Sequence, residues 1–167
     1  MPKNASLIKI ENTKKYGAKV ILYDPLYENR EKITLEISLK ENKKIIKPYD
    51  DLDIIAGQGT VGKEIVEQLK MENIEPDIYL CCCGGGGLIS GSSLYLKHYH
   101  PDIKNYSVEP EEFNDTQLSL ENKKIISNKK SSQSICDALL APQPGDITFP
   151  INQTTLSRGL TVSDLDV

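Results

Sequence analysis

The sequence contains no tryptophan, only two phenylalanines and two methionines, and no long apolar run. Its longest uninterrupted apolar stretch, Ile78–Cys83, is far too short to cross a bilayer as a helix. Residues Met1–Asn4 lack the apolar stretch of a signal peptide, so we expect a cytoplasmic protein with no membrane partner. Concentrated positive charge is also absent, because the 20 Lys and Arg occur singly or in pairs among 24 Asp and Glu. We therefore expect no nucleic-acid partner.

The placement of the four cysteines argues against disulfides and against a zinc site. Cys81, Cys82 and Cys83 are consecutive, and Cys136 lies far downstream. Neighbouring residues of a strand point to opposite faces, and no C-x-x-C pair is present. We interpret the triplet as a buried strand in which reduced cysteine acts as a small hydrophobic residue.

The remaining composition is that of an ordinary globular protein. Charged residues make up 26%, hydrophobic residues 38%, and the net charge is −4. These values exclude a disordered, collagen-like or coiled-coil chain, and 167 residues suffice for one domain or two small lobes. Helix-like and strand-like stretches alternate, which favours an α/β fold with a parallel sheet. The predicted helices are Lys3–Tyr16, Glu28–Asn42, Thr60–Asn73, Leu88–Tyr99 and Phe113–Leu120, and the predicted strands are Ala18–Tyr23, Lys44–Ile46, Asp77–Cys83 and Asn105–Val108. We interpret Ala56–Thr60 as a hinge and Asp77–Cys83 as a central strand.

The most informative segment is a run of four glycines, Gly84–Gly87, between a predicted strand and a predicted helix. Consecutive glycines carry an entropy cost that a fold tolerates where side chains would obstruct something. At a helix N-terminus, bare N–H groups and the helix dipole attract an anion. We therefore predict a phosphate cradle; a flexible linker is the alternative. Two nucleotide motifs do not fit, because the dinucleotide fingerprint needs glycine at 89 or 90 and the Walker A motif needs lysine where Ser92 stands.

Further stretches along the chain match one family in its own order. They are Met1-Pro2-x-x-Ala5, Tyr16–Ala18, Ile54–Gly62, Gly84–Leu88, Gly91, Val108–Glu111, Ser134–Leu140, Gly159-Leu160 and Val162–Asp164. With them the chain resembles the pyridoxal-phosphate (PLP) dependent threonine/serine dehydratases and serine racemases, PLP enzymes of fold type II (tryptophan synthase beta-like). The resemblance implies an open parallel sheet with flanking helices in three layers, truncated at both ends. It also implies that residues 1–55 are part of a small mobile domain and 56–167 part of a large phosphate-binding domain.

The resemblance implies pyridoxal 5′-phosphate as the cofactor. In the family the glycine run holds the cofactor phosphate, which assigns that role here to Gly84, Gly85, Gly86, Gly87 and Leu88. The family usually has Val-Pro-Val before these glycines, and the three cysteines of this chain keep a small apolar strand there.

The resemblance also implies a divalent cation, Mg²⁺ or Ca²⁺, just after the strand that ends near Glu109. The ligands would be the side chains of Glu109 and Asp115 and the main-chain carbonyl of Phe113. Oxygen ligands of this kind suit hard cations. The alternative is a solvated acidic loop, because Glu111 and Glu112 are typical surface residues.

Three functional segments of the family are missing from this chain. They are Ser-x-Lys-x-Arg-Gly-Ala, which carries the Schiff-base lysine, Ser-x-Gly-Asn-His, and the far C-terminal residue that meets the pyridine nitrogen. PLP chemistry needs a lysine of lowered pKa in a sheltered pocket. The lysines present occur in polar clusters or on amphipathic helices. We therefore assign no catalytic residue and expect this chain to be inactive alone.

The reaction that the resemblance implies is that of an ammonia-lyase acting on a small amino acid. L-Threonine or L-serine would lose its α-proton and its β-hydroxyl, and a 2-oxo acid and ammonia would be released. The alternatives are a serine racemase, a hydroxyaspartate dehydratase, a non-catalytic protein that binds a phosphate ligand, and a gene fragment without function. The resemblance further implies a homo-oligomer for the full-length protein.

Overall fold

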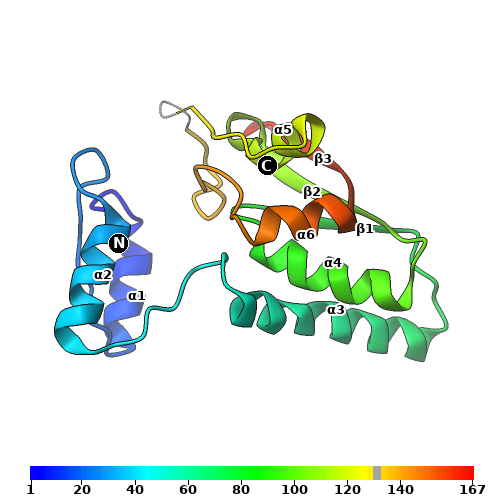
Figure 1. The fold of residues 1–167 in the computed structure, drawn as a ribbon, viewed down its shortest axis with the longest axis horizontal. Helices are drawn as coiled ribbons and strands as arrows, with labels where there is room; N and C mark the ends of the chain where they lie inside the picture. Colours follow the sequence, from blue (N-terminus) through cyan, green and yellow to red (C-terminus); the bar gives the residue numbers. More distant parts are fainter. Residues whose placement is uncertain (130–132) are drawn as a thin grey trace. The chain divides into compact units, whose positions relative to one another are not determined.

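The computed structural model describes residues 1–129 and 133–167 (Figure 1). The chain divides into two compact units, Met1–Ile46 and Lys47–Val167. The expected division after residue 55, with its assignment of the parts to a small and a large domain, stays a prediction.

The first unit contains two helices, α1 (Leu7–Lys15) and α2 (Arg30–Glu41). Both were predicted, although α1 begins four residues later than expected. Gly17 follows α1 with a φ of 81°, a left-handed conformation that favours glycine after the last helical turn. The stop of α1 at this glycine is therefore confirmed.

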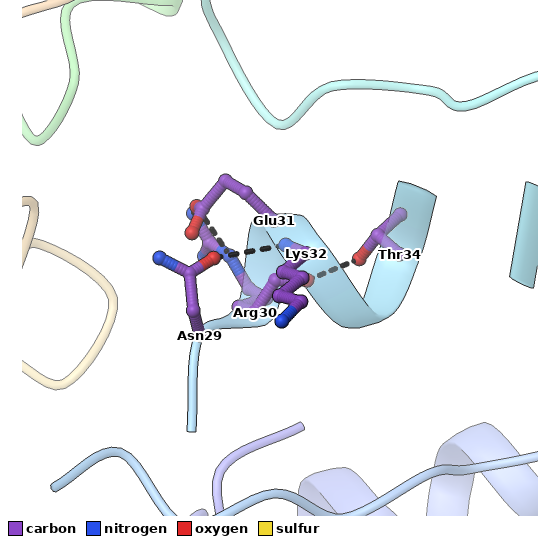
Figure 2. Close-up of polar contacts among 5 residues, drawn as sticks. All are labelled: Asn29, Arg30, Glu31, Lys32 and Thr34. Carbon is purple, nitrogen blue, oxygen red and sulfur yellow. Dashed lines mark hydrogen bonds and ion pairs between the residues drawn. The ribbon is translucent and has the colours of Figure 1, made fainter. Parts of the chain in front are cut away.

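Figure 2 shows the polar contacts that fix the start of α2. The side-chain oxygen of Asn29 accepts the N–H of Lys32 at 2.8 Å, which caps the helix. The Arg30 guanidinium donates to the Glu31 carboxylate at 2.7 Å and holds the pKa of that carboxyl below its usual value. The Thr34 hydroxyl donates to the Arg30 carbonyl oxygen at 2.7 Å. Since no residue of α2 is buried, these local bonds set where it begins.

The two strands predicted for the first unit are wrong. Residues 18–23 contribute only an isolated parallel bridge between Pro2 and Tyr23, and residues 44–46, all of them described, form no strand. Among the described residues of this unit, Ile10 is the one buried hydrophobic side chain. A short strand without an apolar face to cover is marginal in water.

The second unit is built on a parallel sheet of β1 (Ile78–Cys82), β2 (Lys104–Pro110) and β3 (Leu156–Val162), in the order β1-β2-β3. The register pairs Cys82 of β1 with Val108 of β2. The predicted α/β class, an open parallel sheet with flanking helices, is confirmed. The strand β3 was not predicted.

Helices lie on both sides of this sheet (Figure 1). On one side α4 (Gly87–Tyr99) contacts β1 and α6 (Thr148–Thr155), and α3 (Leu52–Glu72) packs along α4. On the other side the 3₁₀ turn η1 (Glu111–Phe113) leads into α5 (Asp115–Asn122), which contacts β2 and β3. Within the part of the chain that the structure describes, none of the helices combines the length and apolar character needed to span a bilayer.

The stretch Ala56–Thr60 lies inside α3, so the hinge prediction is wrong. The helix begins earlier than expected, because the Asp51 side chain accepts the first N–H groups, including that of Asp53 at 2.9 Å. One glycine of α3, Gly62, serves helix packing instead. A Cβ at Gly62 would lie 2.6 Å from the carbonyl oxygen of Ser92, so only glycine lets α3 approach α4 this closely.

The strand β1 lies at an edge of the sheet, not in its centre as predicted. Its residues alternate: Cys81 and the following Cys83 are buried against Ile89, while Cys82 is exposed. The interpretation of cysteine as a small hydrophobic residue is confirmed for Cys81 and Cys83. All four thiols are free.

Candidate functional site

The glycine run forms the turn between β1 and α4, with Gly86 at the N-cap position of the helix. Its φ is 91°, a region that L side chains rarely adopt. Gly86 has no side chain that could accept the first N–H groups of α4, and the first four N–H groups of a helix have no intrahelical partner. The helix dipole adds partial positive charge at the same point. This turn is therefore chemically suited to bind an anion.

The segment before α3 packs directly against the glycine turn. A Cβ at Gly85 would lie 2.3 Å from ring atoms of Tyr49, and one at Gly87 would lie 2.9 Å from the Tyr49 Cβ. At Gly84 the nearest atom would be the carbonyl oxygen of Ala138 at 3.5 Å, an ordinary contact. Side chains at 85 and 87 would thus displace the tyrosine that lies over the turn.

The start of α6 closes the turn from another direction. The Thr148 hydroxyl donates to the carbonyl oxygen of Gly85 at 2.7 Å, and the Gly145 N–H approaches the same oxygen at 3.3 Å. The Asp50 carboxylate accepts the N–H of Ile147 at 2.8 Å and that of Thr148 at 3.4 Å. Asp50 therefore caps α6 from a position next to Tyr49.

Asn152 of α6 is also directed at the turn. It is fully buried, its Oδ1 accepts the Ser90 hydroxyl at 2.9 Å, and its Nδ2 has no hydrogen-bond partner among the described residues. A Cβ at Gly86 would lie 2.7 Å from that Nδ2. The sequence analysis missed Tyr49, Asp50, Thr148 and Asn152. The local sequence there, Asp50-Asp51 before α3 and Pro144–Asp146 before Thr148, is typical of a helix cap and of a turn, and it carries no signal of a site.

The predicted acidic site lies at the end of β2. Glu109 is 1% exposed, and its two carboxylate oxygens accept the N–H groups of Thr116 and Gln117, each at 2.8 Å. Burial raises the pKa of Glu109 to about 7; the two N–H groups oppose this shift, and the charge of Asp115 adds to it. The carboxylate thus ties the end of β2 to the start of α5.

Asp115 is buried beside Glu109 and is likewise 1% exposed. Its Oδ1 accepts the amide of Asn128, and its Oδ2 has no partner within residues 1–129 and 133–167. Burial raises the pKa of Asp115 to about 7, against the effect of the Asn128 bond. Burial, followed by the charge of Glu109, also raises the pKa of the Cys83 thiol, so that thiol stays protonated at neutral pH.

The structure places the three predicted ligand positions at the junction of β2 and α5: Glu109 lies near the end of β2, the buried Phe113 ends η1, and Asp115 begins α5. The solvated-loop alternative is wrong for Glu109 and Asp115, although Glu111 and Glu112 are exposed as expected. The described residues contain no group of three or more His, Cys, Asp or Glu side chains placed to hold a metal ion. A cation here would need main-chain oxygens or water to complete its ligands.

A separate apolar groove of about 640 Å³ runs along α3 and α4. Its lining includes Ile55, Leu94 and Tyr95, and none of the predicted site residues lines it. The chemistry-bearing groups are instead gathered at the carboxyl ends of β1 and β2. In open α/β sheets, ligands bind at this edge of the sheet.

Comparison with known proteins gives one consistent result. The family model described as "Pyridoxal-phosphate dependent enzyme" matches residues 1–167. Over 165 residues, or 98% of this chain and 49% of the relative, the chain is 41% identical to a serine racemase of Schizosaccharomyces pombe. Over 167 residues, all of this chain and 50% of the relative, it is 36% identical to an L-threo-3-hydroxyaspartate ammonia-lyase of Saccharomyces cerevisiae.

The solved structure of a T.th. threonine deaminase superimposes with a TM-score of 0.90 at 31% identity. The match covers 99% of this chain and 53% of that structure. The chain thus spans about half the length of the proteins that it matches.

Proposed function

The chain belongs to the family of pyridoxal-phosphate dependent enzymes, and from this membership we propose that Gly84–Leu88 hold the phosphate of pyridoxal 5′-phosphate. The observation that carries the proposal is the left-handed Gly86 at the N-cap of α4. Its position leaves the first N–H groups of the helix without a side-chain acceptor, at the carboxyl end of the strand β1.

The donors that the turn offers match a phosphate group in number and in charge. Phosphate oxygens accept several hydrogen bonds at once, and the N–H groups of Gly85, Gly86, Gly87 and Leu88 lie in succession at one helix start. Tyr49 forms a wall of this turn and shields it from water on one side. When bound, the cofactor supplies an electron-withdrawing ring that stabilises negative charge on the α-carbon of an amino acid. The share of the glycine turn is to anchor and orient that ring.

The reaction that we propose for the whole protein is deamination of a hydroxy amino acid, L-threonine or L-serine, to a 2-oxo acid and ammonia. The structural similarity to a threonine deaminase supports it. The 41% identity to a serine racemase favours racemisation as a second candidate. The 36% identity to an L-threo-3-hydroxyaspartate ammonia-lyase supports a third, the hydroxyaspartate dehydratase. A homo-oligomeric assembly and a cytoplasmic location stay predictions.

We also propose a divalent cation, Mg²⁺ or Ca²⁺, at Glu109 and Asp115 with the carbonyl of Phe113. Two buried carboxylates side by side are costly as a charged pair, and a cation offsets both the burial and the repulsion. The unpartnered Oδ2 of Asp115 is the group that most needs such a partner. Bound there, the ion would stiffen the junction of β2 and α5 without touching the reacting atoms.

Binding of a non-reactive cofactor analogue tests the phosphate assignment. We expect calorimetry to show binding of 4′-deoxypyridoxine 5′-phosphate, and none of 4′-deoxypyridoxine, because only the first carries the phosphate. Gly86→Val should abolish this binding. Gly57→Val is the matched control, because a Cβ at Gly57 meets nothing within 4 Å. Equal affinity of the two analogues, or unchanged affinity in Gly86→Val, would refute the assignment.

A further inference from the structure

The carbonyl oxygen of Gly85 is held by α6, an element that comes 63 residues later in the chain. Thr148 donates its hydroxyl to this oxygen at 2.7 Å, and the Gly145 N–H lies 3.3 Å from it. Thr148 is itself fully buried. The contact is therefore a fixed part of the interior.

Holding this carbonyl fixes the direction of the next N–H. In a trans peptide the C=O and the N–H point in opposite directions, and the described residues contain no cis peptide bond. With the Gly85 oxygen directed at Thr148, the N–H of Gly86 must point away from Thr148. A peptide between two glycines has few steric limits of its own and could otherwise rotate.

We propose that Thr148 is a positioning residue of the phosphate site, which keeps the Gly85–Gly86 peptide turned so that the Gly86 N–H faces the phosphate. The inference rests on the proposed function, and it adds a residue that does not contact the ligand. Thr148 reaches the glycine turn through the Gly85 carbonyl, while its Oγ1 also accepts the Gly145 N–H at 3.0 Å.

The position of Thr148 is in turn set by the segment on the other side of the turn. The Asp50 carboxylate accepts the Thr148 N–H at 3.4 Å and the Ile147 N–H at 2.8 Å. A Cβ at Gly145 would lie 2.2 Å from the Asp50 Oδ1, so glycine is needed for this approach. The start of α6 is thereby locked in the place from which Thr148 reaches Gly85.

Three substitutions separate positioning from general packing. Thr148→Val keeps the shape and removes the hydroxyl, and Thr148→Ser restores the hydroxyl. Thr155→Val removes a second buried hydroxyl of α6, one that accepts from Ser93 at 2.8 Å and does not reach the glycine turn. Thermal unfolding of all three variants first establishes that each is folded.

Nuclear magnetic resonance can observe the relevant N–H groups selectively. The chain has 11 glycines, of which only Gly84–Gly87 are consecutive. Labelling glycine with ¹³C at its carbonyl and with ¹⁵N therefore gives coupled signals only for the N–H groups of Gly85, Gly86 and Gly87. Titration with 4′-deoxypyridoxine 5′-phosphate then reports both the affinity and the shift of each amide.

We expect the ligand to shift these amides in the unmodified chain. Thr148→Val should weaken binding about tenfold or more, because the Gly86 N–H is then no longer held in place to donate to the charged phosphate. Thr148→Ser and Thr155→Val should stay within about threefold of the unmodified chain. Unchanged binding in Thr148→Val would overturn the inference and leave the phosphate assignment intact. Equal losses in Thr148→Ser or Thr155→Val would overturn it as well, as a packing effect. If the amides of the unmodified chain do not shift, the proposed function itself fails, and the inference with it.

Discussion

Replacing Gly86 by alanine adds one methyl group at the point where the glycine turn becomes α4. Two costs follow from the structure. Gly86 has a φ of 91°, where an L residue is strained by about 1–3 kcal/mol. The added Cβ would also lie 2.7 Å from the Asn152 Nδ2 and 3.0 Å from the Thr148 Oγ1, so a buried side chain must shift.

The second cost is of the order of one buried hydrogen bond, about 1 kcal/mol, because Thr148 and Asn152 bond to Gly85 and Ser90. We therefore expect Gly86→Ala to lower the free energy of unfolding by about 2–4 kcal/mol. The backbone strain accounts for the larger share.

Urea unfolding followed by circular dichroism measures this change, with two glycine variants as controls. Gly84→Ala should cost less than about 1 kcal/mol, because the nearest atom would lie 3.5 Å away, an ordinary contact. Gly57→Ala, in the open on α3, should stabilise by about 0.5–1 kcal/mol. A cost for Gly86→Ala no larger than that of Gly84→Ala would refute the reasoning.

Three further predictions concern the acidic pair and the reaction. In EDTA the free energy of unfolding should fall as the pH rises from about 4 through about 7, because the raised pKa values of Glu109 and Asp115 let the folded state bind more protons than the unfolded state in this range. A Glu109→Gln, Asp115→Asn double variant should flatten this pH profile, and an unchanged slope in the double variant would contradict the prediction. At pH 8, Mg²⁺ or Ca²⁺ at a hundred times its Kd should raise the free energy of unfolding, measured by thermal unfolding, by about 2–3 kcal/mol, and Asp115→Asn should remove this effect. An unfolding temperature of the unmodified chain that does not change with the metal would exclude the cation site. The 167-residue chain with added PLP should release no 2-oxo acid from L-threonine above the blank. Steady release that stops when one lysine of the chain is mutated would contradict this prediction and show that the chain carries its own cofactor-linking lysine.

The elements around the glycine turn were predictable because their sequence patterns are local. An apolar run followed by four glycines and a periodic helix indicated β1 and α4. The start of α6 carries Pro150 in its first turn, where proline costs no helical bond, so its pattern resembles a loop. The strand β3 contains Arg158 and Gly159 and is stabilised by its pairing with β2, which no local pattern reveals.

The site was predictable only in its backbone. The glycines themselves indicated an anion, since their cost requires a reason. The side chains that position them come from far away in the sequence: Asp50 reaches Ile147 across 97 positions, and Thr148 reaches Gly85 across 63. Contacts of this range depend on the packing of α6 against α4 and have no signature in spacing or composition.

A crystal structure of the chain with pyridoxal 5′-phosphate tests the central claim most directly. The account predicts phosphate oxygens about 2.7–3.1 Å from the N–H nitrogens of the Gly84–Leu88 turn, with the Gly85 carbonyl still directed at Thr148. A phosphate bound elsewhere on the chain, with the N–H groups of this turn facing other protein atoms, would contradict it.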